Sequence, residues 1–310
     1  MIDFSYNLST ELRESLEKIE DCRRQVILTM LSPKSELTLK WEKLAEKIYG
    51  ISVLGKDGWE KGQIIKILAS GGKKRRSREK RVISIRRAFD YIHFNWFISS
   101  EEITEKTVGT IYEKLCIGKY KTGNEQIISL LRFVEKANEH PIVKAGIIYN
   151  QIINLSPFDQ ENLVMASLLS YLFLNKYGYN FRGFMVLEEC FLKSKGEYQE
   201  ILVKTKESGN ITLWLEYFAR GLTEQLEKVV REISKENFQN GKSPSFWDLS
   251  ERQKEILSIL ENPDVKMTNR KAQKLFGVSQ ITASRDLTKL ATLGLVLQHG
   301  KGRSVFYTKI

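Results

Sequence analysis

The chain has 310 residues, of which 42% are hydrophobic, with a net charge of +11 and a pI near 9.3; this is long enough for about two domains and favours an anionic partner, with nucleic acid the first candidate. The isolated Cys22, Cys116 and Cys190 form no CxxC pair, which excludes a recognisable zinc site or disulfide framework. No signal peptide and no long apolar run is present, so we expect a cytoplasmic protein without a membrane span.

The first helices are predicted from apolar spacing. Residues 11–30 place Leu12, Leu16, Ile19 and Val26 on one side of a helix. A second helix is predicted over residues 37–49, with Gly50 as its end. Residues 51–72 contain several glycines, which predicts a loop in this stretch.

A dense basic run follows at residues 73–81, with Arg86 and Arg87 close behind. Such a run is either a solvated face or loop, or a contact to the phosphate backbone that supports DNA binding. Both interpretations stay open. Further helices are expected over residues 83–94, 104–115 and 125–138.

Two apolar helices meet at a polar loop between residues 140 and 180. The first buries one face, and the second, Leu163 to Leu174, is apolar almost all round and ends before Gly178. Free backbone N–H groups at the start of a buried helix suit phosphate. The alternative is a plain helix–loop–helix core, with Ser156 capping the second helix and Pro157 in its first turn. The first helix buries Ile142, Ala145, Ile148 and Ile152.

The loop resembles the central motif of the Fic (Fido) family, HPFx[D/E]GNGRxxR, which attaches nucleotide monophosphates to target hydroxyls. This chain reads SPFDQENLVMAS, so that Pro157, Phe158 and Asn162 match. Ser156 stands at the catalytic histidine and Gln160 at the metal-holding carboxylate. The two glycine positions hold Glu161 and Leu163, and the two arginine positions hold Val164 and Ser167.

These differences imply a degenerate site. Ser156 lacks a basic nitrogen, so it cannot act as the general base. Gln160 is a weaker magnesium ligand than a carboxylate, and Glu161 adds negative charge where a triphosphate needs positive charge. We therefore expect no cofactor. ATP and Mg²⁺ would bind only if the protein were a divergent nucleotidyltransferase, acting on a target protein with Asp159 or Glu161 as base or metal ligand.

Two further features depart from the family. Its inhibitory helix carries [S/T]xxxEG, but here Ala45 and Tyr49 stand at the serine and glutamate positions. Its target-docking flap is shortened or lost, because residues 121–124 run almost directly into the next helix. Residues 185–205 and the segment from Trp214 to Gly221 resemble the family's later helices.

The resemblance covers about residues 35–235, and the predicted fold is mainly α. We assign a Fic-like helical domain to residues 1–235, with N-terminal helices at 1–50 and a core at about 80–235. A helix is expected over residues 222–233. Residues 236–246, with Gly241 and Pro244, form a predicted linker to a domain at 247–310.

The last domain begins with a capping box formed by Ser250 and Gln253. Thr268 is predicted to cap a helix over residues 269–276, and Ser279 a third helix that ends at Gly294. Ala283, Leu287 and Leu290 face inward, and β-strands follow at 295–298 and 304–308.

This pattern resembles a bacterial winged helix-turn-helix regulator, a small α+β domain that binds DNA. The third helix fits the major groove, where arginine can bind guanine and glutamine adenine. The wing would reach phosphate or the minor groove. The alternative is a winged helix used for protein contact or dimerisation. The predicted DNA-binding residues are Ser279, Gln280, Thr282, Arg285, Lys289, Lys301 and Arg303.

The leading hypothesis is a DNA-binding protein of the transcriptional-regulator type, whose degenerate Fic-like domain acts as scaffold, dimeriser or sensor. Such proteins often bind two-fold sites as dimers. One alternative is a divergent Fic nucleotidyltransferase that moves AMP from ATP to a protein hydroxyl. Another is a toxin–antitoxin or interaction partner that retains only the fold.

Overall fold

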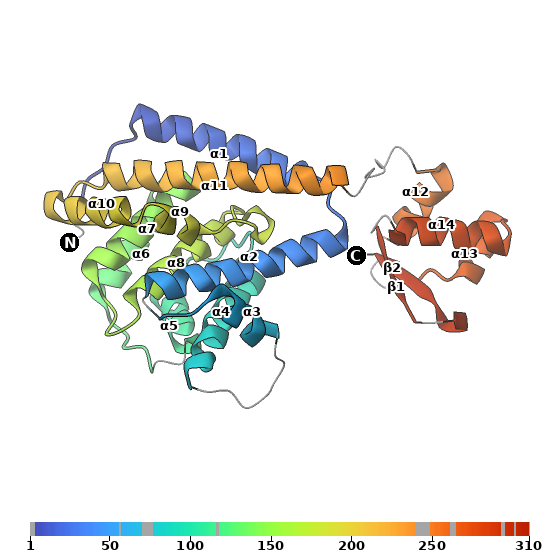
Figure 1. Cartoon of the computed structure of the whole chain (residues 1–310), viewed down its shortest axis with the longest axis horizontal. Coiled ribbons are helices and arrows are strands. Elements are labelled where there is room, and N and C mark those ends of the chain that lie inside the picture. The colour runs from blue at the N-terminus through green and yellow to red at the C-terminus, as the bar shows by residue number, and fades with distance from the viewer. Residues whose placement is uncertain are drawn as a thin grey trace. The chain divides into compact units, whose positions relative to one another are not determined.

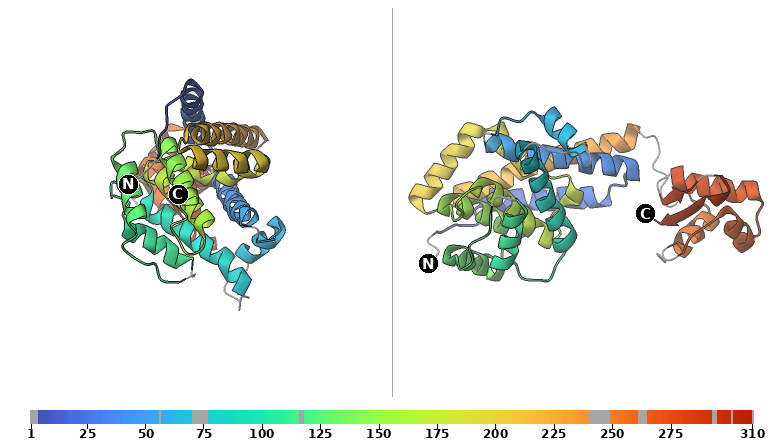
Figure 2. Two further views of the ribbon diagram at one scale, coloured as in Figure 1. Left: turned by 90° about the vertical axis from the view of Figure 1, so that its left-hand side faces the viewer. Right: turned by 90° about the horizontal axis from the view of Figure 1, so that it is seen from below.

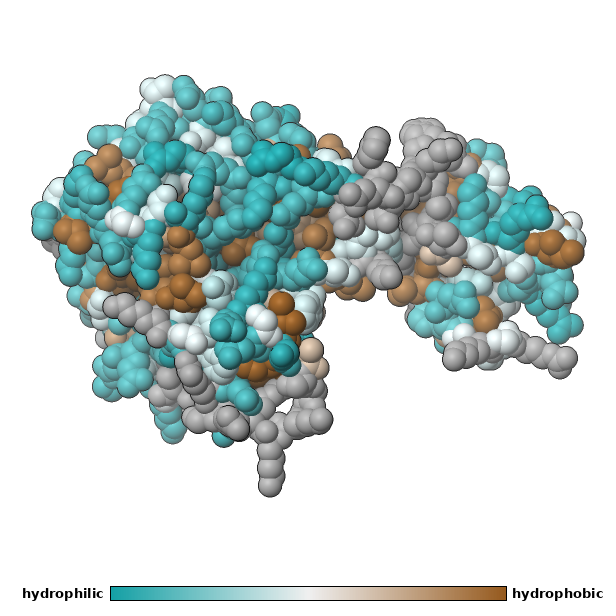
Figure 3. Space-filling view, viewed as in Figure 1, coloured by the Kyte–Doolittle hydropathy of each residue, from teal (hydrophilic) through white to brown (hydrophobic). Residues whose placement is uncertain are grey.

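The computed structural model describes residues 4–55, 57–69, 77–115, 118–239, 249–260, 265–292, 295–300 and 302–309. Contacts divide the chain into two compact units. The first, Met1–Leu28 with Lys40–Arg231, is called the helical unit; the second, Thr29–Leu39 with Glu232–Ile310, contains the C-terminal domain. Within the described residues, no helix is long and apolar enough to cross a membrane. The face seen in Figure 3 is mostly hydrophilic, with separate hydrophobic patches.

The fold is mainly α, as predicted (Figure 1). The α-helices of the described chain are α1 Thr10–Leu28, α2 Pro33–Leu54, α3 Lys61–Ala69, α4 Ser77–Trp96, α5 Glu105–Lys114, α6 Glu125–Lys136, α7 Pro141–Leu155, α8 Asn162–Lys176, α9 Leu187–Lys193, α10 Lys195–Ser208, α11 Thr212–Gln239, α12 Glu251–Ile259, α13 Asn269–Phe276 and α14 Gln280–Thr292. Strands β1 Val296–His299 and β2 Phe306–Lys309 form an antiparallel pair.

The helical unit is built around α7 and α8, and its other helices lie on several sides of this pair (Figure 1, Figure 2). The prediction of an enclosed second helix is confirmed, because every residue of α8 from Val164 to Lys176 is buried. The Ser170 hydroxyl joins the two helices by donating to the Ala145 carbonyl at 2.9 Å. Gly178, with φ of 73°, ends this segment as expected.

Helix α11 packs against α7 through a glycine. The Trp214 indole is fully buried and donates to the Gly146 carbonyl at 2.8 Å. A Cβ atom on Gly146 would lie 2.9 Å from the Leu215 side chain, so a larger residue would push the helices apart. On another side, α11 runs beside α1 (Figure 1), where the Thr223 hydroxyl bonds the Ser15 carbonyl at 3.3 Å.

Helix α2 does not end at Gly50, contrary to the sequence prediction, but continues to Leu54. The glycine serves close packing instead: a Cβ atom there would lie 2.3 Å from the Glu188 Cβ atom. The predicted loop over residues 51–72 is also partly wrong, because it contains the end of α2 and all of α3. Similarly, α11 runs to Gln239, past the start of the linker predicted at 236–246, and residues 240–248 lie outside the described chain.

Where α2 meets α8 and α9, charged groups are buried. The Lys47 ammonium donates to the Gly183 carbonyl at 3.0 Å and lies 5.0 Å from the centre of the Tyr171 ring. The Tyr171 hydroxyl donates to the fully buried Glu188 carboxylate at 2.8 Å. Burial raises the pKa of Glu188 to about 7 and lowers the pKa of Lys47 to about 8, because each charged form has lost its water.

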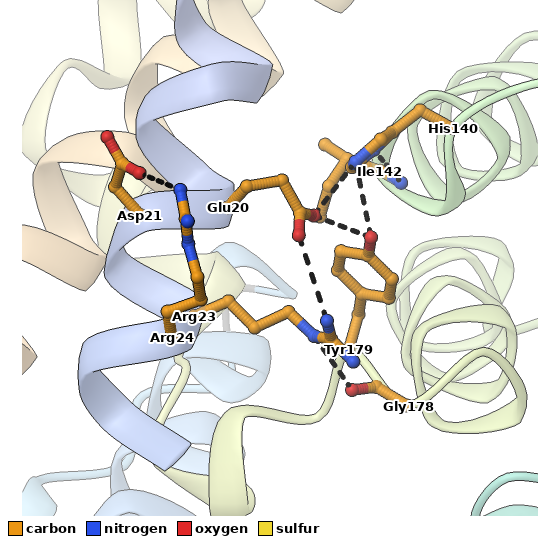
Figure 4. Close-up of polar contacts among 8 residues, drawn as sticks. All are labelled: Glu20, Asp21, Arg23, Arg24, His140, Ile142, Gly178 and Tyr179. Atoms are coloured by element: carbon orange, nitrogen blue, oxygen red, sulfur yellow. Dashed lines mark hydrogen bonds and ion pairs between the residues drawn. The ribbon is translucent and has the colours of Figure 1, made fainter. Parts of the chain in front are cut away.

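A polar cluster fastens α1 to the start of α7 (Figure 4). One carboxylate oxygen of Glu20 accepts from the Tyr179 hydroxyl at 2.5 Å and lies 3.1 Å from the His140 Nε2 atom. The backbone N–H of Ile142 donates to Nδ1 of His140 at 3.2 Å, so the ring hydrogen belongs on Nε2, which faces Glu20. The histidine therefore caps α7 and joins two elements that are distant in sequence.

In the C-terminal domain, α12, α13 and α14 pack around a common hydrophobic core. Ile256, Leu260, Leu287 and Leu290 are fully buried there. The sheet is extended by a bridge in which Met267 and Tyr307 exchange backbone hydrogen bonds of 2.9 and 2.8 Å. Three helices with a small antiparallel sheet confirm the predicted winged-helix organisation, with strand bounds shifted by one or two positions.

Candidate functional site

The loop between α7 and α8 begins with an unexpected cap. Ser156 adopts a left-handed conformation with φ of 46° and follows the last residue of α7. Its backbone N–H bonds the Ile152 carbonyl at 3.0 Å, and its hydroxyl donates to the Ile153 carbonyl at 3.0 Å. The interpretation of Ser156 as a cap of the second helix, with Pro157 in its first turn, is therefore wrong: α8 starts only at Asn162.

The loop is braced by its own side chains. The Asn162 amide accepts from the Phe158 N–H at 3.0 Å and donates to the Phe158 carbonyl at 2.8 Å. The Phe158 ring is 6% exposed and stacks on Tyr112, with ring centres 5.6 Å apart. Asn124, which caps α6, donates its side-chain amide to the Pro157 carbonyl at 3.1 Å. Both the oxygen and the nitrogen of the Asn162 side-chain amide are therefore hydrogen-bonded inside the loop.

A carboxylate stands at the N-terminus of α8. Glu161 precedes this helix in a left-handed conformation with φ of 66°, and its side chain is 14% exposed. The Arg81 guanidinium donates to this carboxylate at 2.7 Å. The same guanidinium lies 3.2 Å from Asp57. Burial raises the pKa of Glu161, and the charge of Arg81 opposes that shift.

The other residues at the motif positions differ in their exposure to solvent. Gln160 is exposed, as is Asp159, which pairs with the exposed Lys121 at 2.9 Å. Val164 and Ser167, at the two arginine positions of the resemblance, are buried inside α8. On α2, Ala45 is fully buried and Tyr49 half-buried.

Sequence reasoning missed the role of Arg81. It appeared only as the last member of the basic run, of which residues 73–76 lie outside the described chain. Arg81 and Glu161 are eighty positions apart, so no local signal could join them. Among the residues that the structure describes, no group of three His, Cys, Asp or Glu side chains could hold a metal ion. His140 begins α7 while the loop follows its end, about 20 Å away along the helix.

The second candidate site is the helix-turn-helix pair α13–α14. All three predicted caps are present. Ser250 and Gln253 exchange bonds of 3.1 and 3.3 Å, Thr268 accepts from Lys271 N–H at 3.1 Å, and Ser279 accepts from Thr282 N–H at 3.2 Å. Such caps satisfy backbone donors at the helix starts.

A buried carboxylate fixes the orientation of α14. Asp286 is 4% exposed and accepts from Arg252 at 2.5 Å and from Gln253 at 2.7 Å, both on α12. On the same side of α14, Ala283, Leu287 and Leu290 are buried, as the spacing predicted. The opposite face is therefore presented to solvent in one defined orientation.

The predicted DNA-binding residues fall into three groups. Gln280, Arg285 and Lys289 are exposed on α14. The hydroxyls of Ser279 and Thr282 lie 3.0 Å apart and take part in the helix cap. In the wing, Lys301 lies outside the described residues. The backbone of Arg303 lies in the 3-10 turn Gly302–Ser304, and its side chain lies outside the description. The helix end predicted at Gly294 also lies outside the described residues.

Other exposed residues at this interface were not predicted. Helix α13 presents three basic side chains, and α14 presents further polar and apolar positions between those already named. The basic residues of α13 could have been found in the sequence as positive charge on the short helix before the turn. The unpredicted residues are Arg270, Lys271 and Lys274 on α13, with Ile281, Ser284 and Thr288 on α14.

Comparison with known proteins agrees with both parts of this description. The model of the DeoR-like helix-turn-helix domain matches residues 252–309. A Fic family protein from Desulfovibrio desulfuricans G20 is similar in structure, with a TM-score of 0.63 and 13% identity over 98% of this chain and 97% of that one.

Two further solved structures share the fold. Fic-1 from C. elegans has a TM-score of 0.57 and 18% identity over 72% of this chain and 71% of that one. A Fic domain containing signaling protein from Bacteroides thetaiotaomicron VPI-5482 has a TM-score of 0.55 and 15% identity over 73% and 98%. No curated protein matches the chain. At these identities the structural similarity establishes the fold, and the family match identifies a DeoR-like helix-turn-helix domain at residues 252–309.

Proposed function

We propose that this protein, a Fic-fold helical unit joined to a DeoR-like helix-turn-helix domain, is a DNA-binding regulator. The observation that carries the proposal is the outer face of α13 and α14. It presents Arg270, Lys271 and Lys274 on the first helix and Arg285 and Lys289 on the second. Five exposed basic residues on the two helices of a helix-turn-helix match the charge of DNA.

In this proposal the two helices have different tasks. Helix α14 enters the major groove, where Arg285 can bind a guanine edge with two hydrogen bonds. The cations of α13 contact backbone phosphates and set the position of the domain. The buried Asp286 keeps α14 fixed on α12, so the helix that carries the contacting side chains is already oriented before DNA arrives.

The helical unit is proposed to act as scaffold, dimeriser or sensor without nucleotide chemistry. The residues present do not fit ATP with Mg²⁺. The Glu161 carboxylate already lies at the N-terminus of α8 and is paired with Arg81, so a phosphate brought there would meet a negative charge. The nearby Val164 and Ser167 are buried and carry no positive charge. Self-association of this unit would suit a two-fold DNA site.

Binding of the whole chain to DNA should depend steeply on salt. We expect the logarithm of the association constant for a random-sequence duplex of about 30 bp to fall with the logarithm of salt concentration, with a slope near −4, if about four phosphates are neutralised. Fluorescence anisotropy between about 50 and 200 mM salt measures this slope. The double variant Lys271→Glu, Lys274→Glu should make this slope less negative, because fewer phosphates are neutralised. Absence of binding at the lowest salt would contradict the proposal and leave the alternative of a winged helix used for protein contact.

Calorimetric titration with ATP and Mg²⁺ tests the enzymatic alternative. We expect no binding heat at nucleotide concentrations up to about 1 mM, because the site lacks compensating positive charge and holds its own carboxylate. The Gln160→Trp variant is the matched control, since it adds a bulky side chain at an exposed loop position without removing the brace made by Asn162. Saturable binding by the parent that this variant abolishes would contradict the proposal and restore the enzymatic alternative.

A further inference from the structure

We infer that Ile281 reads the C5-methyl group of thymine in the major groove, and that the DNA site therefore has a T·A pair opposite the first turn of α14. This inference rests on the proposed DNA-binding function and adds a sequence preference to it. It is carried by the position and exposure of one apolar side chain on the helix that the domain presents.

Ile281 lies in the first turn of α14, on its exposed face. It is 72% exposed, whereas the fully buried Leu290 is nine residues further along the same helix. Nine residues are about two and a half turns, so the two side chains point in opposite directions. Ser284, Arg285 and Thr288 are exposed three, four and seven residues after Ile281, which places them on the same face. The isoleucine thus stands within the row of polar residues available to base edges.

The exposed side chain of Ile281 gains little from packing within the described part of the domain. Among the large hydrophobic side chains described there, Ile281 is more exposed than Leu275 at 52% and Leu297 at 46%. A β-branched residue has a lower helix propensity than alanine or lysine, and an exposed one gains little from packing. Its restricted χ1 rotamer does, however, hold the two branches in a defined place. Such a side chain is suited to a contact that requires little further ordering.

The major groove offers one apolar feature to such a side chain, the methyl group of thymine. Arg285 follows one turn later on the same face and would bind guanine. Because the two side chains are neighbours along the helix, we expect thymine and guanine at adjacent or nearly adjacent base pairs. The polar Gln280, one residue before Ile281, extends the contact toward adenine.

The test combines one methyl group on the DNA with one side chain on the protein. Duplexes enriched from a random pool by the whole chain are resynthesised with deoxyuridine in place of each thymidine in turn, which removes only the C5-methyl group. We expect one position at which this change weakens binding about fourfold, the effect of one buried methyl group. Ile281→Ala should weaken binding to the thymidine duplex and bind both duplexes equally.

Leu297→Ala is the matched control, because Leu297 is an exposed apolar residue on β1 and not on the face of α14. It should keep the fourfold difference between thymidine and deoxyuridine. The inference is overturned if the parent binds every deoxyuridine duplex as tightly as the original, or if Ile281→Ala still discriminates. Failure to enrich any duplex would instead overturn the proposed function itself, so the two failures are distinguishable.

Discussion

Arg285→Ala is expected to weaken binding to the selected DNA site by about 10- to 100-fold and to remove the preference for one base pair. Arg285 is exposed on the outer face of α14, so the substitution removes a base contact without opening the core. Truncation at such a surface position usually changes the free energy of unfolding by less than about 0.5 kcal/mol. Thermal unfolding of the variant should therefore match that of the parent.

Arg270→Ala provides the contrast, because Arg270 is also exposed but lies on α13. We expect it to weaken selected and random duplexes equally and to reduce the salt slope by about 1. Competition binding with duplexes that carry each base at the sensitive position separates the two variants. If Arg285→Ala lowered the affinity for all four duplexes by the same factor, Arg285 would be a phosphate contact and not a base contact.

Glu188→Gln is expected to remove a pH dependence from the stability of the helical unit. Burial raises the pKa of Glu188 from its ordinary value of 4.5 to about 7. Its protonated form is favoured in the folded state, so the resulting stability is fully present below about pH 4.5 and is lost as pH rises through about 7. The loss is on the order of 3 kcal/mol. Glutamine keeps the shape of the protonated acid and cannot ionise.

Urea unfolding at about pH 5, 6, 7 and 8 measures this effect. The parent should lose stability across this range, and the variant should stay nearly level. Lys47 acts in the opposite direction at higher pH, because burial lowers its pKa to about 8 and deprotonation in the folded state relieves the cost of a buried charge above that value. Glu207→Gln is the control, since Glu207 is exposed on α10. If the free energy of unfolding of Glu188→Gln fell with pH as steeply as that of the parent, the ionised carboxylate of Glu188 would be well stabilised in the folded state.

Local signals in the sequence predicted much of the fold. The caps at Ser250, Thr268 and Ser279 follow from residues within three positions of each other, and the enclosed α8 follows from its uninterrupted apolar composition. Gly50 was misjudged because glycine often ends a helix. Here its neighbour is Glu188, more than a hundred residues away, and such long-range packing cannot be read from local sequence.

In the candidate sites, too, local features could be predicted and long-range contacts could not. The spacing of Ala283, Leu287 and Leu290 correctly predicted the buried face of α14, and the exposed Gln280, Arg285 and Lys289 agree with that orientation. The apolar character of Ile281 predicts a core position instead, because apolar residues in helices are normally buried. The pairing of Arg81 with Glu161 depends on how α4 packs against α8, which the sequence pattern did not determine.

The contact between Glu161 and Arg81 also bears on whether the motif that this loop resembles could be completed by substitution. Replacing Ser156 with histidine would restore one motif residue, but the carboxylate would still lie at the start of α8, held by Arg81 at 2.7 Å. Replacing Glu161 alone would remove one of the two carboxylate partners of Arg81 and leave Asp57 as the other. Each single substitution is thus neutral or harmful before the others are made. This order of effects would make the complete motif difficult to reach in this loop by stepwise mutation.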